Sequence, residues 1–194
     1  MQTTWTILAS AHTALRSAVA GVRDDDWTRP TPCVDWTVAQ VLQHAAGDQQ
    51  AYAAVLGEGG FPSYDPFAPS GTLDDDALAL VEPPLAAAWL AFSKVGTDDA
   101  AVPVPLPQGS LAAPVAVGAA ALDAAVHAWD IAVATGQPSP VDSALAGQLH
   151  EVALQIVEPL RGFAYADALP GDDGDALDAL LRHLGRDPHW APNA

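Results

Sequence analysis

Three side chains of the metal-ligand type stand out in this sequence: His44, Asp123 and His127. Asp123 precedes His127 by four residues, so an α-helix through both would place them on one face, one turn apart. His44 follows the run PCVDWT at residues 32–37, which marks the start of another helix, by about two turns. If the two helices face each other in a bundle, the three side chains would converge on a divalent metal and leave one coordination position open.

The residues alone also allow a site without metal. An Asp and a His one turn apart can form a simple hydrogen-bonded pair, and the helix around His127 is apolar nearly all round. Buried charges there need a partner, which is either each other within a polar network or a shared cation. Asp48, one turn after His44, is a further ligand, an acceptor that orients the imidazole, or a solvated surface residue, the interpretation we favour. Asp130 is interpreted as a helix cap or a hydrogen-bond acceptor beside the site.

The composition predicts a cytoplasmic protein that binds neither nucleic acid nor membranes. The net charge is −17, from 24 acidic and 7 basic residues, and only Arg182 and Arg186 lie close together, so no phosphate-binding surface is expected. A single cysteine, Cys33, cannot form an intramolecular disulfide and fits a reducing compartment; we interpret it as a small buried residue. The first residues do not resemble a signal peptide. The apolar stretch 111–134 contains Pro, Asp and His, which indicates a buried helix and not a membrane span.

Apolar residues repeat at helical spacing through most of the chain, so the predicted fold is an all-α bundle in one domain, residues 1–194. Long loops, above all 61–72, connect the helices. The third helix begins at the acidic run 74–76 or at Pro83, because two adjacent prolines disfavour a helix interior. Asp35 is the expected N-cap of the second helix. The expected helices are 5–20, 36–56, 74–92 with the alternative start, 114–135, 141–160 and 175–184.

Three segments carry a family resemblance. Residues 27–44, with TPCVDWTV followed by VLQH, resemble the N-terminal motif of the mycothiol-dependent maleylpyruvate isomerase-like proteins, within the DinB-like superfamily. The segment HAWDIAVATG at 127–136 is similar to their second motif. The ending LLRHLGRDPHW at 180–190 resembles the C-terminal signature of a short actinobacterial metal-binding subfamily.

The resemblance implies a DinB-like four-helix bundle with long crossover loops, additional C-terminal helices and a divalent metal, usually zinc. Carried over residue by residue, the metal ligands are His44, Asp123 and His127. The family commonly has Glu where this chain has Asp123. The shorter side chain reaches less far, so the metal would shift toward its helix, bind through a water, or bind less tightly.

The resemblance further implies a zinc-dependent enzyme that uses a low-molecular-weight thiol of the mycothiol type in S-transfer or isomerisation, with an electrophilic substrate. Nickel is the alternative ion, since availability can decide which metal is bound. Maleylpyruvate isomerisation itself is not expected, because a dicarboxylate needs cationic partners that this chain scarcely offers. The alternative is a non-catalytic metal-binding or interaction bundle, and a homodimer remains open. A catalytic protein should show a cleft beside the metal, bounded by the loop 61–72.

Overall fold

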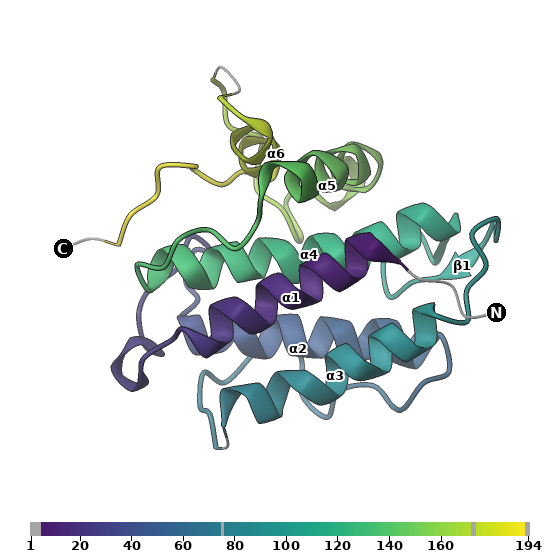
Figure 1. The fold of residues 1–194 in the computed structure, drawn as a ribbon, viewed down its shortest axis with the longest axis horizontal. Coiled ribbons are helices and arrows are strands. Elements are labelled where there is room, and N and C mark those ends of the chain that lie inside the picture. Colours follow the sequence, from purple (N-terminus) through teal and green to yellow (C-terminus); the bar gives the residue numbers. More distant parts are fainter. Residues whose placement is uncertain (1–4, 75, 172–173, 193–194) are drawn as a thin grey trace.

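Four helices form the core of the protein in the computed structural model, which describes residues 5–74, 76–171 and 174–192. These helices are α1 (Thr6–Ala20), α2 (Val38–Val55), α3 (Ala77–Phe92) and α4 (Ala113–Ala134). Helix α1 packs along α4, and α2 packs against both α3 and α4 (Figure 1). The predicted all-α, DinB-like bundle is therefore confirmed.

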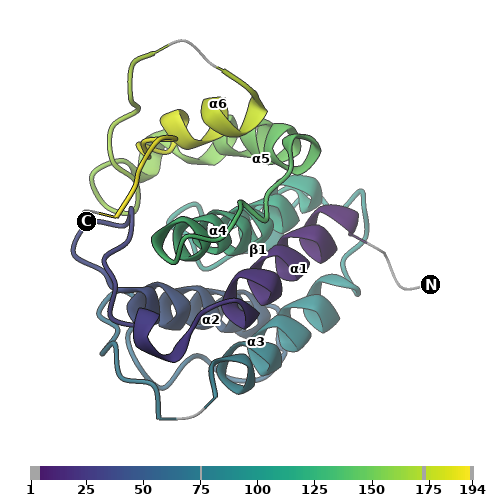
Figure 2. The same cartoon turned by 60° about the vertical axis from the view of Figure 1, so that its left-hand side comes forward.

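Two further helices cover the opposite side of α4. Helices α5 (Ser143–Ile156) and α6 (Ala176–His183) pack on each other, and α5 also packs on α4. Figure 1 and Figure 2 both show α4 lying between α2 and this C-terminal pair. Helix α4 thus has neighbours on both sides, which places its side chains at the centre of the protein.

Helix α4 is almost entirely buried. It is the one helix of the described residues with the length and hydropathy of a membrane span, but 89 % of its most apolar window is buried within the protein, as in a core helix. A small residue on α4 lets α5 pack closely against it. A Cβ added at Gly118 would lie 2.5 Å from the Val152 side chain, so this contact depends on the glycine.

The start of α2 differs from the prediction. The N-cap is Thr37, not Asp35: the Thr37 hydroxyl accepts from the Gln40 backbone N–H, and the Gln40 side chain accepts from the Thr37 N–H. Asp35 has a positive φ of 71°, a left-handed conformation that ends the preceding turn. The reciprocal cap fixes the helix start two residues later than expected and thereby sets the direction of His44.

The third helix begins at Ala77 and contains both Pro83 and Pro84 in its interior. The Asp76 side chain caps it by accepting from two backbone N–H groups of the first turn. Buried Val81 and Leu85 on either side of the prolines keep the helix packed despite the missing hydrogen bonds. The alternative start at Pro83 was therefore wrong. Asp75, part of the expected acidic start, lies outside the described residues.

The remaining elements are short. Two-residue strands β1 (Val102–Pro103) and β2 (Ser110–Leu111) pair antiparallel in the connection between α3 and α4. Two 3-10 turns, η1 (Asp24–Asp26) and η2 (Glu158–Leu160), follow α1 and α5. The second turn ends the expected fifth helix early and directs residues 161–166 back toward α4.

Candidate metal centre and its pocket

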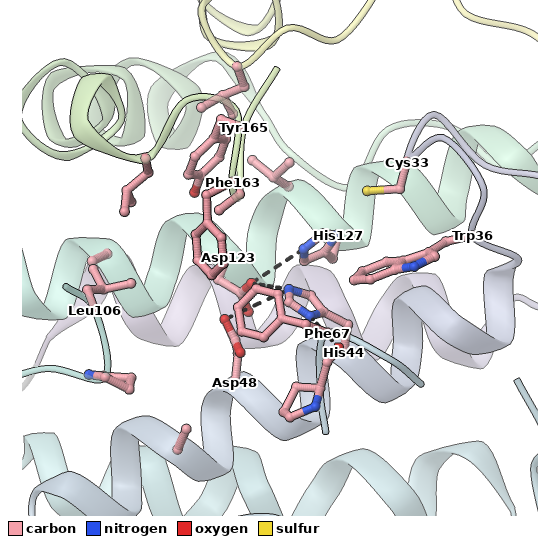
Figure 3. A pocket seen from close by; sticks show the side chains of 18 of the residues that line it. Cys33, Trp36, His44, Asp48, Phe67, Leu106, Asp123, His127, Phe163 and Tyr165 are labelled. Atoms are coloured by element: carbon pink, nitrogen blue, oxygen red, sulfur yellow. Dashed lines mark hydrogen bonds and ion pairs between the residues drawn. The ribbon is translucent and has the colours of Figure 1, made fainter. Parts of the chain in front are cut away.

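Helices α2 and α4 bring the three predicted side chains together. The Nε2 atoms of His44 and His127 lie 3.6 and 3.4 Å from the same Asp123 oxygen, Oδ1. Both imidazoles are buried, and the Asp123 side chain is 10 % exposed. Figure 3 shows the three side chains pointing toward one another between the two helices. The helical spacing places Asp123 and His127 on one face of α4, and the packing of α2 on α4 brings His44 to that face.

Each imidazole is oriented by a hydrogen bond from its other nitrogen. His44 Nδ1 lies 2.9 Å from the Pro66 carbonyl oxygen, and His127 Nδ1 lies 2.9 Å from Asp130 Oδ2. A carbonyl and a carboxylate can only accept, so both Nδ1 atoms carry the proton and donate. Both Nε2 atoms therefore face the Asp123 carboxylate. This is the arrangement of histidines that bind metal through Nε2.

The distances within the cluster fit a metal ion better than direct hydrogen bonds. Charge-assisted N–H···O bonds are typically about 2.7–2.9 Å long, shorter than the observed 3.4 and 3.6 Å. In a tetrahedral site with metal–ligand bonds of about 2.0–2.1 Å, ligand atoms lie about 3.3–3.4 Å apart. The three side chains thus have the donor chemistry of such a site, the two distances from Asp123 Oδ1 are close to its ligand spacing, and all three ligand atoms lie within 4.8 Å of one another.

The electrostatics of the cluster hold a carboxylate opposite an imidazolium when no ion is present. Burial raises the pKa of Asp123, but the two imidazoles of His127 and His44 next to its carboxylate outweigh this effect and hold the pKa well below its usual range. Burial lowers the pKa of His127, whereas the carboxylates of Asp123 and Asp130 raise it well above its usual value. A metal ion would take the place of this proton.

Gln49 and His12, neither of which the sequence predicted to belong to the site, position the second oxygen of Asp123 by hydrogen bonds. Gln49, fully buried on α2, donates from Nε2 to the Ala120 carbonyl at 2.9 Å and to Asp123 Oδ2 at 3.4 Å. The Gln49 Oε1 accepts from His12 Nε2 of α1 at 2.9 Å. Burial lowers the pKa of His12 to about 4, so it is neutral at pH 7. His12 and Gln49 therefore direct the second Asp123 oxygen away from the imidazoles.

Asp130 accepts a hydrogen bond from His127, and Arg186 of the C-terminal region binds Asp130 in turn. Arg186 donates from Nε and Nη2 to the two Asp130 oxygens at 3.0 and 2.8 Å, and from Nη2 to Cys33 Sγ at 3.3 Å. The Asp130 side chain is fully buried. Burial raises the pKa of Asp130, but Arg186 and His127 lower it by more than burial raises it, so the Asp130 carboxyl group is ionised. Asp130 is thus a hydrogen-bond acceptor beside the site, one of the two roles expected.

A second cluster of ligand-type atoms, formed by Cys33, His127 and Asp130, shares one imidazole with the first. Its carboxylate already accepts hydrogen bonds from His127 and Arg186 on both oxygens. A guanidinium next to both Asp130 and Cys33 would also repel a divalent cation. The cluster with Asp123 is therefore the better candidate. Cys33, expected to be a buried residue, is only partly buried and lines the pocket described next.

The cluster forms one wall of an open pocket of about 780 Å³. Its rim includes residues of the loop 61–72, as expected for a catalytic protein, and residues that follow α5. Asp48, expected on a solvated surface, instead faces the pocket, with Oδ2 3.8 Å from His44 Nε2. Burial and the neighbouring Asp123 carboxylate raise the pKa of Asp48 to about 7.

Sequence patterns contained a signal for some of the residues that we missed. His12 falls within the apolar repeat of α1, and Gln49 lies on the buried face of α2, so both were polar residues at core positions. Arg186 gave no such signal, because it lies 56 residues from Asp130 in sequence.

Comparisons with known proteins agree with this architecture. The family model of the mycothiol maleylpyruvate isomerase N-terminal domain matches residues 8–132, which include all three candidate ligands. Two uncharacterized proteins of Mycobacterium tuberculosis, from strains CDC 1551 / Oshkosh and ATCC 25618 / H37Rv, are each 30 % identical over 180 residues. These alignments cover 91 % of this chain and 93 % of each relative. No solved structure gives a significant match. The chain belongs to the mycothiol maleylpyruvate isomerase N-terminal domain family.

Proposed function

We propose that the protein binds one divalent metal ion through His44, Asp123 and His127 and uses it with a low-molecular-weight thiol of the mycothiol type. The reaction is S-transfer to an electrophile or thiol-assisted isomerisation. One observation carries the proposal: two Nε2 atoms lie 3.6 and 3.4 Å from one carboxylate oxygen, close to the ligand spacing of a tetrahedral site, in the wall of an open pocket. The family match supports the choice of thiol.

Zinc is the ion that this donor set suits best. Two imidazoles and one carboxylate are nitrogen and oxygen ligands of the kind found in catalytic zinc sites with three protein ligands. Nickel binds similar ligands with comparable affinity in the Irving–Williams order, so the metal that occupies the site depends on which ion is available. The two relatives from Mycobacterium tuberculosis, aligned over 93 % of their length, support assignment to a short actinobacterial subfamily.

The residues around the cluster have distinct roles in this proposal. When bound, the metal supplies a Lewis acid that favours the thiolate form of a coordinated thiol at neutral pH. Asp123 compensates part of the ion's charge, while Pro66 and Asp130 keep both imidazoles in the ligating tautomer. Asp48 presents its carboxylate to the same pocket and is the acceptor for the thiol proton. The pocket places the electrophile next to the sulfur.

Cobalt substitution tests this proposal. Co(II) replaces zinc in the purified protein, and its absorption spectrum changes when a thiolate becomes a ligand. We expect mycothiol, and more weakly glutathione, to produce a sulfur-to-cobalt charge-transfer band in the wild type that is lost in His44→Ala. Cobalt binding with no spectral change at saturating thiol would refute the thiol-dependent enzyme and favour a non-catalytic metal-binding bundle.

A further inference from the structure

Among the residues that the structure describes, none offers a free cation to an anionic ligand in the pocket. Of the seven basic residues in the chain, Arg186 is the one that lines the pocket, and its guanidinium is bound to both oxygens of Asp130. Arg161 is paired with Glu158, and Arg182 donates to a backbone carbonyl. Both of these arginines therefore have partners outside the pocket. A carboxylate or phosphate in this pocket would find no basic side chain to neutralise it.

A metal ion at the cluster would not supply the missing positive charge. Asp123 faces the site and its carboxylate offsets one of the two charges of a divalent ion. A bound thiolate, whose proton passes to Asp48, offsets the other charge. The loaded site is then neutral, which disfavours a second anion in the remaining space.

The walls of the pocket are apolar and aromatic. Of the eight exposed large hydrophobic side chains among the described residues, five line this pocket and three (Leu90, Leu154 and Leu169) do not. The five are Val34, Phe61, Tyr64, Phe67 and Phe163. The ring centroids of Phe67 and Phe163 lie 5.4 Å apart, and the Phe67 ring lies 5.3 Å from the ring of His44. Exposed apolar side chains gathered around a cavity of this size mark a ligand site.

Part of this apolar wall lies outside the family-matched segment. The candidate ligands fall within residues 8–132, whereas Ile156, Leu160, Phe163 and Tyr165 come from the segment that follows. This segment is placed over the pocket by η2 and by the packing of α5 on α4. The surface that contacts the substrate is thus partly separate in sequence from the residues that hold the ion.

We propose that the electrophile bound in this pocket is a neutral, largely apolar molecule, selected by the aromatic wall that Phe67 and Phe163 form, and not a carboxylate. This inference rests on the proposed function for the term electrophile. The selectivity of the pocket can be measured without any reaction.

Two fluorescent probes with the same ring skeleton provide the test. N-phenyl-1-naphthylamine is neutral, and 1-anilinonaphthalene-8-sulfonate carries one added sulfonate. We expect the zinc-treated protein to bind the neutral probe at least about tenfold more tightly, because the sulfonate would be desolvated without a cationic partner. Equal or tighter binding of the sulfonate probe would overturn the proposal.

Variants locate the binding. Phe163→Ala removes a side chain that is 68 % exposed, and it should weaken binding of the neutral probe about tenfold without unfolding the protein. Leu154→Ala removes an apolar side chain of α5 that is 53 % exposed outside the pocket, and it should leave binding unchanged. Equal effects of the two variants would contradict the assignment to this pocket. Metal content, measured on the same samples, decides the proposed function separately.

Discussion

Arg186 is the residue through which the C-terminal region supports the site, and its loss should be costly. The guanidinium makes two hydrogen bonds, of 3.0 and 2.8 Å, to the fully buried carboxylate of Asp130. Arg186→Met would leave that carboxylate without its cation. Removing one partner of a buried ion pair typically destabilises a protein by about 3–5 kcal/mol. We therefore expect a loss of this size in the free energy of unfolding, measured by urea denaturation at pH 7.

Two comparisons isolate the buried charge as the cause. Arg16→Met breaks a pair with Glu82 whose side chains are 37 % and 47 % exposed, and it should cost about 1 kcal/mol or less. Adding Asp130→Asn to Arg186→Met should restore part of the lost stability, because no charge remains unpaired while His127 keeps an acceptor. A loss below about 1 kcal/mol in Arg186→Met, or no recovery in the double variant, would refute this reasoning.

The pH dependence follows from the direction of the Asp130 shift. Its pKa is lowered in the folded protein, so its contribution is present above the unfolded-state pKa of about 3.9 and is lost as the pH falls below that value. Arg186→Met removes the charge that contributes most to this lowered pKa. The stability difference between wild type and variant should therefore be largest near neutral pH and shrink as the pH falls below about 4.

Three further predictions concern the site and the helix packing. Metal binding should release a proton, because the raised pKa of His127 keeps Nε2 protonated in the metal-free protein. Zinc affinity should therefore rise with pH. Calorimetry in two buffers of different ionisation enthalpy measures the number of protons released. Gln49→Leu should weaken zinc binding about 10–100-fold, measured by competition with a chelator, because Asp123 loses its second contact. Gly118→Ala should destabilise the protein by about 1–3 kcal/mol in urea, whereas Gly147→Ala, with its nearest neighbour at 4.0 Å, should stabilise it by about 0.5–1 kcal/mol.

Each of these predictions has a contrary outcome. A calorimetric enthalpy that does not depend on the buffer would show that no proton is displaced from the site. Unchanged chelator competition in the Gln49 variant would show that Asp123 is positioned without it. Equal stability of the two glycine variants would mean that α4 and α5 are packed less closely than the distance to Val152 indicates.

The helices were predictable because apolar spacing and caps act locally, and the errors arose where two local signals competed. Asp35 and Thr37 are both suitable N-cap residues, and only the backbone geometry, with a left-handed Asp35, decides for Thr37. The pair Pro83-Pro84 disfavours a helix locally, yet burial of Val81 and Leu85 outweighs that preference. Tertiary packing is not encoded in the spacing of neighbouring residues.

The candidate site, like the helices, was predictable where local sequence spacing determines the structure. Helical periodicity alone pairs Asp123 with His127. His44 was a candidate from its place on a second helix, but no local rule links residues on separate helices, so the family motif was needed to join it to the pair. Arg186 could not be predicted, since its contact with Asp130 depends on how the C-terminal helices fold back over α4. The orientation of Asp48 likewise depends on the pocket around it.

The most direct test of the account is the zinc content of untagged protein by elemental analysis, after incubation with zinc and removal of the free ion. We predict about one equivalent per chain in the wild type and in Cys33→Ala, and none in His44→Ala or His127→Ala, all with an unchanged helical circular dichroism spectrum. Zinc lost in Cys33→Ala but kept in His44→Ala would place the ion in the second cluster. No zinc in the wild type would contradict the central claim and leave a polar network within a structural bundle.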